Sequence, residues 1–160
     1  MTETPAAVAG RYFDAIGRRD LDAAAACWTP GGIDHLAPVG ELRVPDEWRE
    51  YFESVFAAMP DFRYEVLSTV AHDEHVAVHW RAVGNFTGQP YQGILATGAR
   101  TETEGLDLVH VEDGKISRLD SYWDDAAVIR QIGLLPPRNS RRERALISLF
   151  NVSTRLRRRK

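Results

Sequence analysis

The sequence has 160 residues, of which 44% are apolar and 27% charged, which is typical of one globular domain and excludes a disordered chain. No apolar run approaches the ~18 residues needed to cross a bilayer. The single cysteine, Cys27, excludes an internal disulfide and a cysteine-rich zinc site. The net charge is −3, but residues 138–160 carry +8, so residues 1–137 carry −11. This acidic part argues against nucleic acid as a partner.

Helices are expected first along the chain. Thr4-Pro5 is a typical helix start, and apolar residues then recur at helical spacing up to Gly17. A short second helix is predicted from Leu21 to Trp28, and residues 33–44 are expected to be irregular chain or a short strand. A third helix opens at Pro45-Asp46 and ends at Pro60.

Strands are expected after Asp61, where apolar residues alternate with period two. Two further strands, residues 101–111 and 116–123, flank Asp113-Gly114, a strong signal for a two-residue hairpin turn. A last helix is predicted from near Asp124 to Gly133. This order predicts an α+β fold, in which a curved antiparallel sheet wraps around the N-terminal helices as a cone with an internal pocket.

The hairpin places several acidic side chains together. With a two-residue turn and no irregularity, Asp107 lies opposite Asp120, and the alternation puts Asp107, Asp120, Tyr122 and Asp124 on one face of the sheet. Two paired carboxylates in a pocket repel one another, so one would hold its proton near neutral pH and could serve as an acid or base. Two alternatives stay open: the acidic face is simply solvated, or a longer turn shifts the register.

The C-terminal part of this region resembles a known family. The segments are Asp113-Gly114-Lys115-Ile116, Ser121-Tyr122-Trp123-Asp124 and the run from Arg130 to Pro136. They are similar to the signature of SnoaL-like polyketide cyclases, within the nuclear-transport-factor-2-like superfamily, and the resemblance covers roughly residues 5–136. It implies a pocket enzyme without metal or organic cofactor, in which the aspartate at the Asp124 position is the general acid/base of an intramolecular aldol ring closure.

The remaining site residues follow from the resemblance together with strand parity and the apolar stripe of the third helix. Asp120 or Asp107 would tune the pKa of Asp124 or replace an assisting histidine, and Tyr122 would donate a hydrogen bond. His110 lies near the position of that histidine, but the hairpin register turns it to the opposite face. The further substrate-binding candidates are His35, Trp80, Phe86, Tyr51 and Phe56. Phe86 and Asn85 depart from a more polar family motif, and Asp124 could instead cap the last helix.

The basic C-terminal segment lies outside the resemblance, so we expect a domain over residues 1–137 and an extension over residues 138–160. Residues 140–157 can form a basic amphipathic helix, which could dock on the acidic part of its own dimer, on an acidic partner or on a membrane surface. The family analogy predicts a homodimer. The N-terminus lacks the features of a secretory signal, so a cytoplasmic location is expected.

Three functions are compatible with these patterns. The first is a cofactor-independent cyclase for a hydrophobic, polyketide-like carbonyl compound. The second is an isomerase or epoxide hydrolase that uses the same carboxylates. The third is a non-catalytic binding or assembly domain of the same fold.

Overall fold

The computed structural model describes residues 3–158, beginning with helices α1 (Pro5–Gly17) and α2 (Leu21–Ala25). Thr4 caps α1 as predicted, since its side chain accepts a hydrogen bond from the Ala7 amide. The second helix is shorter than predicted, because Trp28 already begins a strand. Helix α3 (Asp46–Ala58) follows two short strands.

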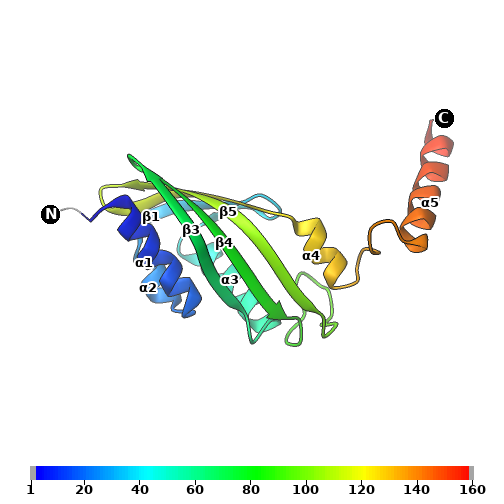
Figure 1. Ribbon diagram of the computed structural model, residues 1–160, viewed down its shortest axis with the longest axis horizontal. Coiled ribbons are helices and arrows are strands. Elements are labelled where there is room, and N and C mark those ends of the chain that lie inside the picture. Colours follow the sequence, from blue (N-terminus) through cyan, green and yellow to red (C-terminus); the bar gives the residue numbers. More distant parts are fainter. Residues whose placement is uncertain (1–2, 159–160) are drawn as a thin grey trace.

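One six-stranded sheet forms the body of the molecule, in the spatial order β2-β1-β6-β5-β4-β3. Its strands are β1 (Trp28–Leu36), β2 (Gly40–Arg43), β3 (Arg63–His72), β4 (His75–Asn85), β5 (Arg100–Glu112) and β6 (Lys115–Trp123). The sheet is long and curved, and the N-terminal helices lie against one of its faces (Figure 1).

The predicted α+β fold with a curved sheet and N-terminal helices is confirmed, with two refinements. The sheet is not wholly antiparallel, since β1 runs parallel to β6. It also remains open, with β2 and β3 as its edges. Residues 33–44, expected to be irregular chain or a short strand, supply the end of β1 and all of β2, and these two segments pair with each other.

The apolar core lies between the helices and the concave face of the sheet. Its fully buried side chains include Tyr12 and Ile16 of α1, Trp48 of α3, and Val78 and Val109 of the sheet. Trp48 Nε1 donates a hydrogen bond to the Tyr12 hydroxyl at 3.2 Å, which links the two helices inside this core. The helices therefore hold the concave face away from water over part of its length.

Two helices follow the sheet. Helix α4 (Asp125–Gln131) lies beside β5, whereas α5 (Arg141–Arg157) projects away from the body (Figure 1) and contains no buried residue. No helix among residues 3–158 is long and apolar enough to span a membrane.

Candidate active site

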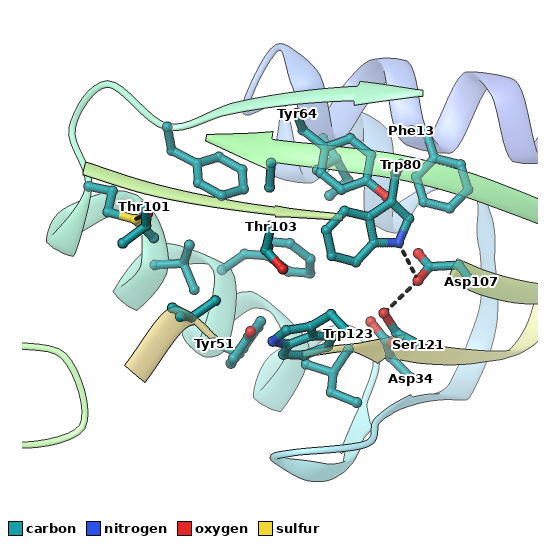
Figure 2. Close-up of a pocket in the computed structure, with 18 of the residues that line it drawn as sticks. Phe13, Asp34, Tyr51, Tyr64, Trp80, Thr101, Thr103, Asp107, Ser121 and Trp123 are labelled. Carbon is teal, nitrogen blue, oxygen red and sulfur yellow. Dashed lines mark hydrogen bonds between the residues drawn. The ribbon is translucent and has the colours of Figure 1, made fainter. Parts of the chain in front are cut away.

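A partly open cavity lies between the concave face of the sheet and helices α1, α3 and α4. It encloses about 930 Å³, counted out to its opening. The walls are mostly aromatic and aliphatic, and the acidic groups among them are Asp34, Asp107 and Asp125. Figure 2 shows Asp34, Asp107 and Ser121 gathered at one end of the cavity. An apolar pocket with a few convergent polar groups is the usual form of a small-molecule site.

The register of the β5–β6 hairpin decides which acidic residues enter this cavity. The Asp113-Gly114 turn forms as predicted, with Glu112 opposite Lys115. A β-bulge follows at Ser117, since Val111 pairs with Ile116 while His110 pairs with Arg118. Asp107 consequently lies opposite Ser121, so the predicted pairing with Asp120 is wrong.

Asp107 is buried at the closed end of the cavity, with 5% of its surface exposed. Its Oδ1 accepts hydrogen bonds from Trp80 Nε1 at 2.6 Å and from the Ser121 hydroxyl at 2.5 Å. Burial raises the pKa of Asp107 to about 7, because its charged form loses hydration, and the neighbouring donors Ser121, Trp80 and Tyr64 oppose that rise. The prediction of one carboxyl group that holds its proton near neutrality therefore applies to Asp107, but its cause is burial and not Asp120.

A glycine lets Trp80 reach Asp107. Gly105 lies directly opposite Trp80 on the neighbouring strand. A Cβ atom at Gly105 would come within 2.2 Å of the Trp80 indole, so any other residue would displace the ring. The bare backbone of Gly105 thus allows the indole to lie across β5 and donate to the carboxylate two residues further along.

Asp34 is one of two acidic site residues that sequence reasoning missed, the other being Asp125. Asp34 lies on β1 opposite Leu119, points inward and is 1% exposed. Its Oδ1 has no hydrogen-bond partner among the described residues. Burial, and then the nearby charges of Asp107 and Asp120, raise the pKa of Asp34 well above its usual value, so its neutral form is favoured.

Tyr64 of β3 is a third polar residue near this end. Its hydroxyl is shielded from solvent and has no hydrogen-bond partner within residues 3–158. Burial and the adjacent Asp107 carboxylate raise the pKa of Tyr64 well above its usual value, so the hydroxyl keeps its proton. In Figure 2 the Tyr64 hydroxyl points toward the end of the cavity that holds Asp107.

A second set of polar residues lines the cavity. It comes from α3, α4 and the loop after β4. Tyr51, predicted to bind substrate, lines the cavity with Tyr91 and Asp125. Burial raises the pKa of both tyrosines, and Asp125 adds to the effect. Asp125 directly follows the expected catalytic residue Asp124, but it is the side chain of Asp125 that reaches the cavity.

Asp120 and Tyr122 lie on the outer, convex face of the sheet, contrary to the predicted common face with Asp107, and His35 lies beside them. The strand alternation after the bulge turns Ser121 and Trp123 inward and their neighbours outward. Asp120 binds Arg118 and His35 Nδ1, the latter at 2.9 Å, and the Arg118 guanidinium contributes most to lowering the pKa of Asp120. His35, predicted to bind substrate, belongs to β1 and does not line the cavity.

Asp124 is exposed and caps helix α4. Its Oδ1 accepts a hydrogen bond from the Ala127 amide at 2.9 Å. Asp124 does not line the cavity, so the alternative capping role describes its position in the structure. A catalytic role for Asp124 stays a prediction.

The other predicted binding residues divide between the cavity and its surroundings. Trp80 lines the cavity, whereas Phe56 packs between Phe52 and Phe62, and Phe86 is buried without lining it. His110 lies on the outer face, 3.4 Å from Glu74 and 3.6 Å from Glu112. A substrate-binding role for these outlying residues has no support from the geometry.

Together, the curved sheet and its apolar, carboxyl-containing cavity define a small-molecule pocket protein. A comparison with known families matches residues 6–132 to the SnoaL-like polyketide cyclases. The chain belongs to this family, and it has the nuclear-transport-factor-2-like fold that the sequence resemblance implied.

Two curated relatives give the family match more detail. The chain is 31% identical over 110 residues to the aklanonic acid methyl ester cyclases DnrD of Streptomyces peucetius and DauD of Streptomyces sp. strain C5. The matched segment covers 65% of this chain in both cases. It spans 70% of DnrD and 63% of DauD.

Solved structures share the fold at low sequence identity. AclR from Streptomyces galilaeus, described as a candidate hydroxylase, superposes with a TM-score of 0.74 at 20% identity, over 97% of this chain and 95% of AclR. IdmH from Streptomyces antibioticus, described as a candidate polyketide cyclase, gives 0.71 at 21% identity, over 82% and 99%. A Catenulispora acidiphila protein with a ketosteroid isomerase-like fold gives 0.67 at 12%, over 83% and 95%.

Proposed function

We propose that the chain is a polyketide cyclase that closes a ring in a hydrophobic, polyketide-like ester by proton transfer at Asp107. The observation that carries the proposal is a buried carboxyl group with a pKa of about 7 at the closed end of an apolar cavity. Membership of the family and the relatives' names support the reaction class.

The proposed reaction needs one group that takes a proton and later returns it. The Asp107 carboxylate removes a proton from a carbon flanked by carbonyl groups, and the electron pair moves onto a carbonyl oxygen as an enolate. The enolate carbon then bonds to a second carbonyl carbon, whose π electrons move to its oxygen. That oxygen takes the proton from Asp107, so the residue ends as it began and no redox change occurs.

The environment of Asp107 suits this cycle. A pKa near the working pH lets one carboxyl group act as base and then as acid. Both protein hydrogen bonds end on Oδ1, so Oδ2 accepts none from the described side chains and can take the proton. The flat aromatic walls, including Trp80 and Trp123, can orient a polycyclic substrate by stacking.

Isosteric substitutions at two aspartates test the proposal. Asp107→Asn keeps an oxygen that can accept from Trp80 and Ser121 but removes the base, so we expect kcat for ring closure to fall by at least about 100-fold. Asp124→Asn keeps the helix cap, because asparagine is an equally good N-cap, and should retain activity. Ring closure is followed by chromatography of an aromatic polyketide methyl ester and its product.

The paired variants also separate the alternatives. Loss of turnover in Asp124→Asn, with full turnover in Asp107→Asn, would transfer the acid/base role to Asp124 as the sequence resemblance implies. Ligand binding without turnover of any carbonyl substrate would favour the non-catalytic binding domain. Isomerisation or epoxide opening without ring closure would favour the second enzymatic alternative.

A further inference from the structure

We propose that Asp34 and Tyr64 form an oxyanion-binding subsite at the closed end of the cavity, which holds the enolate oxygen of a substrate between their two O–H groups. The subsite rests on the proposed function for the identity of that oxygen. Its ligand class, an oxygen anion attached to an apolar or aromatic body, follows from the pocket itself.

The first reason to propose this subsite is that two polar groups in the cavity lack hydrogen-bond partners. Asp34 Oδ1 and the Tyr64 hydroxyl are both shielded from solvent, and neither has a partner within residues 3–158. Leaving a buried polar group unpaired costs free energy, so each of these groups calls for a partner that the protein itself does not supply. Both residues line the same cavity as Asp107, so a ligand there can supply the missing partner.

The protonation states are the second reason. Burial is the largest influence on both groups, and it favours the neutral carboxylic acid of Asp34 and the neutral phenol of Tyr64. Each neutral group has a proton to donate, and neither adds a negative charge that would repel an enolate. Donors fixed in a water-poor site stabilise a developing oxyanion strongly, because they need no reorganisation.

The third reason for the subsite is the position of Asp34 and Tyr64 relative to Asp107. Asp34, Tyr64 and Asp107 line the same cavity, and the Asp107 carboxyl raises the pKa of both other groups. Figure 2 shows Asp34 on one side of the Asp107 carboxyl and the Tyr64 ring on the other. A carbonyl oxygen held between the two donors would bring its α-carbon toward Asp107, as proton removal requires.

An anion-binding experiment tests the subsite without any turnover. The probe is 4-nitro-1-naphthol, which is present as its anion at the assay pH of about 8. Its neutral counterpart is 1-nitronaphthalene. Titrations use Asp107→Asn protein, because the amide imitates the protonated state of Asp107 that faces an enolate. We expect the naphtholate to bind this protein at least about 10-fold more tightly than 1-nitronaphthalene does.

Variants in the same background assign the effect to the two donors. Tyr64→Phe and Asp34→Val should each weaken naphtholate binding by about 10-fold or more and leave 1-nitronaphthalene binding unchanged. Asp34→Asn, which keeps an N–H donor, should restore part of the affinity. Tyr122→Phe is the matched control, since Tyr122 lies on the outer face with 52% of its surface exposed.

Stability measurements separate a ligand role from a structural one. Asp34→Val replaces the buried carboxyl group, with its unpaired oxygen, by an apolar side chain of similar size, so the variant should be at least as stable as its parent while it loses the anion. Unchanged naphtholate affinity in both variants, or no preference for the anion over 1-nitronaphthalene, would overturn the subsite. If naphtholate binding follows these expectations but no ring closure is found, only the proposed function fails. If Asp107→Asn abolishes ring closure and the anion preference is absent, only the subsite fails.

Discussion

The orientation and the raised pKa of the Asp107 carboxyl group result from its burial beside two hydrogen-bond donors. The Trp80 indole and the Ser121 hydroxyl fix the orientation of the carboxyl group, and the surrounding apolar walls weaken its ionised form. Asp120, one strand position before Ser121, has the opposite behaviour, because the Arg118 guanidinium stabilises its charge on the outer face. Two aspartates on adjoining strands thus differ in pKa because of the face that each occupies.

The raised pKa of Asp107 predicts a pH-dependent stability. Between about pH 4 and 7, folded Asp107 keeps a proton that the unfolded chain has released, so its contribution to stability falls as the pH rises through this window. Above pH 7 both states are ionised and the contribution stays constant.

Asp107→Asn removes this linkage. The difference in the free energy of unfolding between wild type and variant should therefore shift in favour of the variant by about 2 kcal/mol from pH 5 to pH 7, as measured by urea denaturation. A difference that does not change with pH would show that Asp107 has an ordinary pKa in the folded state. Asp124→Asn is the control, since its side chain is exposed.

Some site residues could be predicted from the sequence, and others could not. Asp107, Trp80 and Tyr51 were identified by strand alternation and the aromatic pattern, and all three line the cavity. Asp34 was missed because the glycines before it suggested irregular chain. Only its pairing with β6 shows that it points inward.

At the level of elements, turn chemistry was a better guide than strand register. Asp113 and Gly114 both have positive φ, at 50° and 74°, as their residue types suggested. The residue types around Ser117 did not predict a bulge. The extra residue at Ser117 shifts every β5–β6 partner beyond it by one position. The order of helices and strands from Pro45 to Gly133 was correct because it depends on periodicity, whereas the facing pairs depend on a local irregularity.

At the level of the whole molecule, α5 is the element without a visible role. Its apolar side chains Leu149, Phe150 and Leu156 are 61–70% exposed. The Arg130–Glu143 ion pair joins its start to α4, and Glu143 also accepts a hydrogen bond from the Asn139 amide just before α5. Docking on a dimer, on an acidic partner or on a membrane surface remains a prediction for this helix.

The exposure of α5 has a measurable consequence for stability. Serine at both Leu149 and Phe150 should change the free energy of unfolding by no more than about 0.5 kcal/mol, because these side chains bury little surface in the monomer. Ile116→Ala, a substitution in the core, should cost roughly 2–5 kcal/mol. A comparable loss in the α5 variant during urea denaturation would show that the helix is covered in solution.

The proposed proton transfer requires a buried carboxyl group at the end of the cavity that titrates near neutral pH. Carbon-13 NMR of protein labelled at the aspartate carboxyl carbons can follow each group through a pH titration, with Asp107→Asn protein used to assign the resonance. We expect the Asp107 signal to titrate with a midpoint at about pH 7. A midpoint near the ordinary aspartate value of about 4 would contradict the account, because the group would then be too weak a base for the proposed proton transfer.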